Sequence, residues 1–251
     1  MGLCCHMGSD LERIERELRA GQNTPFQTYD EAVRYGARCQ IMGIYPDSLD
    51  PESLGVAKGE ARFMGRASFM AVKAARIAIQ QSRIDPTPLG VAIGSGTGDV
   101  ETHREIAERL RTTGSMRRVA ATVIPKLMAS TLSANLVNVL RSTGPSCTAS
   151  AACAGGNYSI AIAASWIETG MVDAVIAGGV EVKDPHFFAG FDSMRAYNGQ
   201  DNDSPDRATC PYARDWQASC SPRAPAFLFS SRASRRNREA LRSSACSEAT
   251  A

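Results

Sequence analysis

Cys153 is the residue whose setting in this chain most clearly favours chemistry. It lies in GPSCTASAACAGG, from Gly144 to Gly156, where a Gly-Pro turn leads through small and β-compatible residues to the thiol. Two glycines and a long apolar segment with helical spacing follow, so the pattern predicts a strand-to-helix corner. The N–H groups and positive end of a helix favour thiolate over thiol, which makes Cys153 a candidate nucleophile. The alternative is a small buried residue, as free cysteines often are.

A glycine-rich loop at Gly94, Gly96 and Gly98 is the second candidate. It follows a predicted strand and precedes an amphipathic segment from Asp99 to Arg111, and this order of elements can cradle a phosphate. The spacing G-x-G-x-G lacks the third glycine of the dinucleotide fingerprint, and no Gly-Lys-Ser/Thr follows it. We therefore expect close backbone packing here and not a nucleotide site.

The elements that must position these loops alternate in type along the chain. Apolar spacing predicts helices over 60–81, 125–140 and 158–169, and strands over 90–95 and 172–177. Helix and strand in alternation argue for an α/β sandwich with a largely parallel sheet. The helix after Cys153 is rich in alanine and is expected to be buried on nearly all sides. Residues 183–215 are predicted to form an irregular lobe.

The composition is that of a globular protein: 43% of the residues are hydrophobic, and the net charge of +2 predicts no polyanionic partner. No run of about 18 apolar residues could span a bilayer, and the start lacks the features of a signal peptide, so we expect a cytoplasmic protein. None of the eight cysteines forms a CxxC pair. Reduced thiols are therefore expected, with no disulfide and no metal site.

Five separated motifs together resemble the β-ketoacyl-acyl-carrier-protein synthase family of thiolase-like condensing enzymes. They are GPSCTASAACAGG, PKLMAS at Pro125 to Ser130, DAVIAGGVE at Asp173 to Glu181, FFAGFDSMRA at Phe187 to Ala196 and SPDRATCPYARD at Ser204 to Asp215. The resemblance implies the amino-terminal half of a duplicated α/β/α/β/α sandwich. It places an incomplete ketoacyl synthase amino-terminal domain at residues 1–215.

The resemblance also implies a chemistry. Cys153 would take an acyl group from a carrier-protein thioester, and its backbone N–H would form half of an oxyanion hole. A malonyl unit would then lose carbon dioxide and attack the acyl-cysteine, in fatty-acid or polyketide synthesis. Phe191 would lie against the acyl pocket, and no cofactor is implied. The implied partners are an acyl carrier protein with acyl or malonyl phosphopantetheine and, through the strand and helix around Cys153, a second synthase chain in a homodimer or related dimer.

The histidines of the family are the main departure. The family uses two, in HGTGT-type and GHN-type motifs, to assist decarboxylation. This chain has His6, His103 and His186, none of them in such a motif, and His103 is expected to be solvated. We therefore expect that the chain alone does not condense acyl and malonyl thioesters. Two alternatives remain: a non-catalytic dimerisation partner of an intact synthase, and a cysteine hydrolase with His186 as its base.

Both ends depart from the family pattern. Of the first strand, RRVVVTG in type, only a remnant remains at Gly2-Leu3, and we expect its loss to remove a central strand. After Asp215 the pattern GFVxxEGAGxLVLE is absent, and 22 of the last 36 residues are Ser, Arg or Ala. Read one base out of frame with permitted codons, the stretch to Ser231 gives LAGFVLAEGAGILVLE. We therefore predict that residues 216–251 are a frameshifted, disordered basic tail, the alternative being a functional basic tail that binds nucleic acid.

Overall fold

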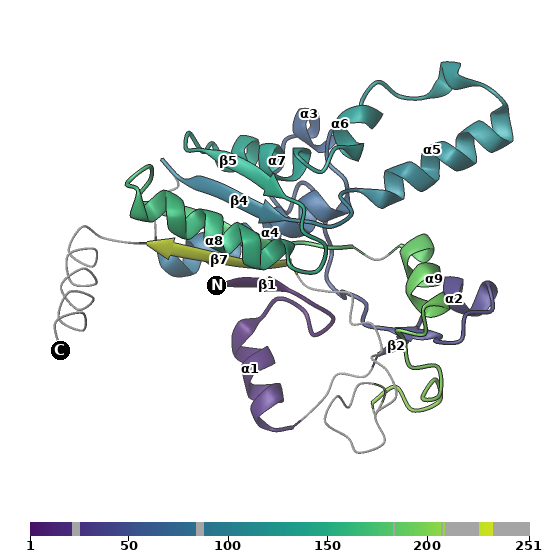
Figure 1. Ribbon diagram of the computed structural model, residues 1–251. Helices are drawn as coiled ribbons and strands as arrows, with labels where there is room; N and C mark the ends of the chain where they lie inside the picture. Colours follow the sequence, from purple (N-terminus) through teal and green to yellow (C-terminus); the bar gives the residue numbers. More distant parts are fainter. Residues whose placement is uncertain (22–25, 84–87, 183, 207, 209–225, 233–251) are drawn as a thin grey trace.

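A five-stranded mixed sheet forms the centre of the fold, in the order β1-β7-β6-β4-β5 (Figure 1). The computed structural model describes residues 1–21, 26–83, 88–182, 184–206, 208 and 226–232. The strands are β1 (Gly2–Cys4), β4 (Gly90–Gly94), β5 (Ser146–Ala149), β6 (Ala174–Gly179) and β7 (Ala226–Arg232). β4 is parallel to β5 and β6, whereas β7 is antiparallel to β1 and β6. The carboxyl ends of β4, β5 and β6 therefore meet at one edge of the sheet.

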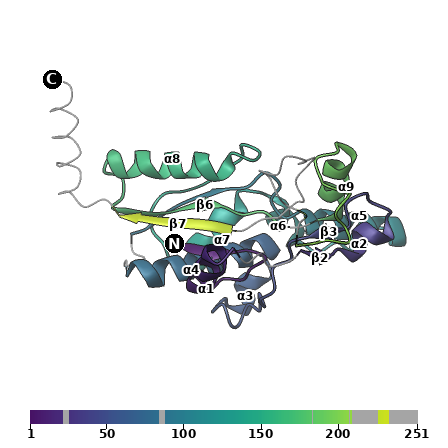
Figure 2. The ribbon, with the colours of Figure 1, turned by 90° about the horizontal axis from the view of Figure 1, so that it is seen from below.

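Helices cover both faces of this sheet. α4 (Arg66–Ser82) and α7 (Thr131–Leu140) pack on one face, and α8 (Gly155–Glu168) packs on the other (Figure 2). Ala71, Ala74 and Ala75 of α4 are fully buried, so that the helix backbone lies close to the strands. β4 and β6 are apolar and buried between the layers, as parallel strands covered by helices usually are. The α/β class predicted from the sequence is confirmed.

A second cluster of apolar side chains lies beside the main sheet. It joins α2 (Asp30–Arg34) and α9 (Pro185–Ser193) with a two-stranded sheet of β2 (Gln27–Thr28) and β3 (Ile41–Met42). Asp192 of α9 accepts hydrogen bonds from the backbone N–H groups of Arg38 (2.9 Å) and Cys39 (3.1 Å). The segment predicted to be irregular thus contains a regular helix.

The remaining helices are short or exposed. They are α1 (Leu11–Arg19), α3 (Lys58–Ala61), α5 (Val100–Thr113), the 3₁₀ turn η1 (Met116–Arg118) and α6 (Val123–Leu127). Two helices predicted as continuous are each divided, into α3 and α4 and into α6 and α7. Gly65 explains the first break, because it is the extended N-cap of α4 and its Cα lies against the Asp99 carboxyl group, where a Cβ would overlap.

Both ends of the chain differ from expectation. β1 is a three-residue strand as the remnant implied, but it lies at the edge of the sheet and not at its centre. Residues 226–232, which we expected to be disordered, form β7 between β1 and β6. The sequence AFLF that opens this strand is apolar and aromatic, which favours a paired strand whatever its origin. The rest of the predicted tail, 216–225 and 233–251, lies outside the described residues.

Candidate active site

Cys153 lies in the turn that joins β5 to α8. The strand ends at Ala149 and the helix has Ala154 as its N-cap, so the predicted strand-to-helix corner is confirmed. Ala152 has φ +46°, a left-handed conformation that non-glycine residues seldom adopt. The turn is closed by hydrogen bonds from Ala154 N to Ala151 O (2.9 Å) and from Gly155 N to Ala152 O (3.2 Å). The thiol that emerges from this turn is exposed and not buried.

Glycines allow the start of α8 to lie directly on the sheet. A Cβ on Gly94 of β4 would come within 2.1 Å of the carbonyl carbon of Gly155, and one on Gly179 of β6 would come within 3.2 Å of the Gly156 Cα. Backbone therefore touches backbone at both places. This contact is the physical reason for glycine at positions 94, 155 and 179.

Ser159 fixes the first turns of α8 to β6. It is fully buried, and its hydroxyl lies 2.7 Å from the carbonyl oxygens of both Gly156 and Gly178. It also accepts a hydrogen bond from Gly178 N at 3.2 Å. One hydroxyl thus satisfies main-chain groups on the helix and on the strand.

The glycine-rich loop after β4 receives a carboxylate from its own chain. Glu181 Oε1 accepts hydrogen bonds from the Ser95 hydroxyl (3.2 Å) and from Gly96 N, and Oε2 accepts one from the Thr97 hydroxyl at 2.6 Å. The donors that could have bound a phosphate are therefore directed at Glu181, which agrees with the expectation of packing over nucleotide binding. The sequence showed Glu181 directly after a predicted strand but gave it no role.

Among the described cysteines, Cys153 is the exposed one. Cys4 and Cys39 are buried, Cys5 and Cys147 are half-buried, and all of them are free thiols. Burial raises the pKa of the Cys4, Cys5 and Cys147 thiols, which disfavours their thiolates. In the described part of the chain, the thiol best placed to meet a large substrate is that of Cys153.

The three histidines have other surroundings in the structure. The His6 ring packs on Phe26 with centroids 5.3 Å apart, and burial lowers the pKa of His6. His103 is exposed on α5, as predicted. His186 Nδ1 lies 3.0 Å from Asp184 Oδ1. No hydrogen bond between described residues joins any of these rings to Cys153, so the described contacts give the hydrolase hypothesis no support.

Phe191 lies on α9 in the second apolar cluster. Its ring centroid is 5.7 Å from that of Tyr197, and it is partly buried. These contacts place it in the lobe beside the sheet. Its position against an acyl pocket stays a prediction.

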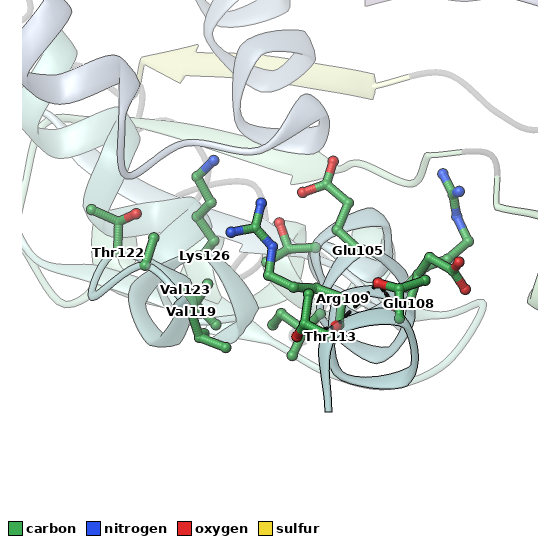
Figure 3. A pocket seen from close by; sticks show the side chains of 13 residues that line it. Glu105, Glu108, Arg109, Thr113, Val119, Thr122, Val123 and Lys126 are labelled. Atoms are coloured by element: carbon green, nitrogen blue, oxygen red, sulfur yellow. Dashed lines mark hydrogen bonds between the residues drawn. The ribbon is translucent and has the colours of Figure 1, made fainter. Parts of the chain in front are cut away.

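A surface pocket of about 810 Å³ lies between α5 and the segment 119–126 (Figure 3). Figure 3 shows Glu105, Arg109 and Thr113 on the helix side and Val119, Thr122 and Lys126 on the other. Neither Cys153 nor Phe191 lines this pocket. It is therefore separate from the proposed reaction centre.

Two kinds of feature are missing from the described ranges. None of their helices is long and apolar enough to cross a bilayer. They also hold no cluster of three or more His, Cys, Asp or Glu side chains that could bind a metal ion.

The site and its sheet have counterparts in known proteins. Residues 3–214 match the family model of the β-ketoacyl synthase N-terminal domain. This chain belongs to the β-ketoacyl synthase family. The motifs that carried the resemblance in the sequence lie in the matched range, apart from the final residue of the last one, and so does the exposed Cys153 turn.

Curated relatives of this synthase domain are 3-oxoacyl-[acyl-carrier-protein] synthases. Synthase 1 of Haemophilus influenzae is 27% identical over 216 residues, which cover 84% of this chain and 52% of the relative. Synthase 2 of Staphylococcus aureus is 34% identical over 213 residues, covering 80% and 51%. The chain thus spans about half the length of the curated relatives it matches.

Solved ketosynthases share the fold. A β-ketoacyl synthase from Burkholderia phymatum superposes with a TM-score of 0.81 at 25% identity and covers 96% of this chain and 59% of that one. A type II polyketide ketosynthase in complex with its acyl-carrier protein gives a TM-score of 0.76 at 18% identity, covering 96% and 58%. The thiolase-like class predicted from the motifs is confirmed.

Proposed function

We propose that Cys153 accepts an acyl group from a carrier-protein thioester. The Cys153 thiolate attacks the thioester carbonyl, a new carbon–sulfur bond forms, and the bond to the phosphopantetheine sulfur breaks. The released phosphopantetheine thiolate takes up the proton that Cys153 gave to solvent, so the exchange needs no oxidant and no cofactor. The N–H of Cys153 is assigned to the carbonyl oxygen of the tetrahedral intermediate.

The observation that carries this proposal is the exposed thiol in the left-handed turn between β5 and α8. Family membership supplies the substrate class, because the curated relatives act on substrates of an acyl carrier protein. A solved relative is described in complex with its acyl-carrier protein. We assign the same partner, with acyl or malonyl phosphopantetheine, to this chain.

Condensation with malonyl-acyl-carrier-protein is assigned to the complete enzyme and not to this chain alone. The resemblance requires two histidines to assist decarboxylation, and none of the three present has a hydrogen bond to Cys153 within the described residues. The chain is therefore proposed to stop at the acyl-cysteine.

Intact-protein mass spectrometry tests both statements. Incubation with an acyl-carrier-protein thioester should add one acyl mass to Cys153, hydroxylamine should remove it, and C153A should remain unmodified. Acylation of C153A at the wild-type rate would refute the assignment of Cys153. Formation of 3-oxoacyl product by the wild-type chain with malonyl thioester and no other protein would refute the proposed stop.

A dimerisation partner of an intact synthase is the second candidate. β5 pairs with β4 alone in the described sheet, and α8 exposes Tyr158 (60%) and Ile160 (40%) on the two sides of its buried stripe. An open strand edge beside a helix with exposed apolar side chains is suited to pairing with a related chain. Co-expression with a tagged full-length synthase should recover a complex, and Y158E should weaken it. A complex that Y158E leaves intact would contradict this use of α8.

A further inference from the structure

The glycine-rich loop and Glu181 connect three strand ends at the sheet edge that carries Cys153. Glu181 follows β6, and Ser95 to Thr97 follow β4. The Glu181 carboxylate accepts one hydrogen bond from each of these three loop residues. Charge-assisted bonds of this kind are stronger than neutral ones, so the loop after β4 is fixed to the end of β6.

The same loop is also fixed to the end of β5. Ser95 N donates a hydrogen bond to Ala149 O at 3.0 Å. A Cβ on Gly96 would lie 3.7 Å from the Cα and the carbonyl oxygen of Ala152. The loop therefore passes beside the residue that precedes Cys153, with room for no more than a methyl group between them.

Ala152 needs such support. Its φ of +46° is a left-handed conformation, which is unfavourable for an L-residue and persists only where the surrounding structure holds it. The direction in which the Cys153 side chain leaves the turn depends on this backbone. A change in the loop after β4 would thus reach the sulfur through Ala152.

We propose that Glu181 is a positioning residue for Cys153: it holds the Ser95–Thr97 loop at the end of β5 and beside Ala152, and thereby fixes the direction of the thiol. Its effect on acyl transfer rests on the function proposed above. The positioning itself is a property of the turn and can be measured without any acyl substrate.

Three variants of the full chain separate positioning from general stability. E181L removes both acceptors at similar volume. E181Q keeps an oxygen that can accept from Gly96 N and Ser95, and its amide can donate to the Thr97 oxygen. E168L makes the same change as E181L at an exposed glutamate at the end of α8 and serves as the control.

Hydrogen exchange of the peptide covering 150–157 is the first measurement. E181L should speed its exchange about tenfold, as expected when strong local hydrogen bonds are lost, while E181Q and E168L stay close to wild type. Exchange in a peptide from α4 should not change. If E181L is too unstable to purify, T97V, which removes one donor to the carboxylate, should speed exchange in the same peptide to a smaller extent.

The second measurement compares two reactions of Cys153, followed by peptide mass spectrometry: acylation by an acyl thioester and alkylation by iodoacetamide. Acylation needs a directed approach, so E181L should lower the acylation rate about tenfold more than the alkylation rate, and E181Q should restore the wild-type ratio. Unchanged exchange in 150–157, or equal loss in both reactions, would overturn the proposal. A wild-type chain that is alkylated but never acylated would refute acyl transfer, and the exchange data would still decide the role of Glu181.

Discussion

Asp99 is a carboxyl group that the fold buries with one oxygen unpaired. Its side chain accepts a hydrogen bond from the Thr102 hydroxyl at 2.7 Å, the residue is 4% exposed, and Oδ1 has no hydrogen-bond partner among the described residues. Burial raises the pKa of Asp99 above its usual range, although Thr102 and the Lys126 charge oppose this effect. A raised pKa means that the folded state binds the proton more tightly than the unfolded chain does. Stability should therefore fall as pH rises through the interval between the unfolded and folded pKa values.

Asp99→Asn should stabilise the protein near neutral pH. The amide keeps an acceptor for Thr102 and carries no charge to desolvate, so the free energy of unfolding should rise by about 1 kcal/mol at pH 7. The gain should shrink as pH falls toward 4, where the wild-type carboxyl is itself protonated. Urea unfolding of both proteins at several pH values checks this. A loss of stability at pH 7 would mean that attraction to Lys126 outweighs the cost of burial.

Of the side-chain roles around the site, that of Cys153 could be predicted from the sequence and that of Glu181 could not. The Cys153 corner could be read from local spacing, because small residues, a thiol and two glycines in sequence already specify a turn into a helix. The hydrogen bonds that Ser95 and Thr97 donate to Glu181 could not be predicted in this way, because they join residues more than 80 positions apart. The available signal was the position of a carboxylate directly after a parallel strand, at the sheet edge where the glycine loop also ends.

α8 shows what close packing of a helix on a sheet requires. Its first turn touches β4 and β6 through backbone atoms of four glycines. The helix was expected to be buried on nearly all sides, but it exposes Tyr158 and Ile160. Because the four glycines carry no side chains, the backbone of α8 lies directly on the strands. This close contact determines how far the Cys153 turn stands from the sheet.

Gly94→Ala should disrupt this contact. The added methyl would overlap the Gly155 carbonyl group, which is backbone and cannot rotate away, so α8 must move. We expect a loss of about 1–3 kcal/mol in the free energy of unfolding, as for other overpacked core sites. Chemical denaturation measures it. Gly190→Ala in α9 is the control, because a Cβ there meets nothing within 4 Å; equal loss in both variants would contradict the argument.

Element types were easier to predict than element limits. Apolar periodicity located α4, α7, α8, β4 and β6, because each has a buried face that the sequence repeats. The break at Gly65 depends on contact with Asp99, which lies in another element and leaves no local trace. α9 was missed although Asp184 and Pro185 form an N-cap and a first-turn proline, since its aromatic residues were read as an irregular cluster.

At the scale of the molecule, β7 brings a late segment of the chain, 226–232, into the same sheet as β1 near residue 1. It lies between β1 and β6 and pairs with both. Its range, 226–232, coincides with the part of the shifted reading frame that gives ILVLE. A frameshifted origin for residues 216–251 stays a prediction, and sequencing the locus through the Asp215 codon tests it: an adjacent frame without GFVLAEGAG would exclude it.

Truncation tests whether β7 matters to stability. A chain ending at residue 232 keeps β7, and we expect its unfolding midpoint to match that of the full chain. A chain ending at residue 215 leaves β1 without its partner strand and β6 with an open edge, so it should unfold at least about 5 °C lower and aggregate more readily. Thermal unfolding with light scattering compares the two. Equal midpoints for all three chains would show that β7 contributes nothing to the sheet.

The pairing of β1 with β7 also has a consequence for the order of assembly during translation. Leu3 aligns with Phe227, so the first strand made must wait for almost the last described residues before its pairing is complete. Closing so long a loop is entropically costly and slow compared with forming local contacts. On the ribosome, β4, β5 and β6 with α4 and α8 can form their parallel layers first, and β1 can pair with β7 only after residues 226–232 have been synthesised. The Cys153 turn is thus complete before the sheet edge that carries the amino terminus is closed.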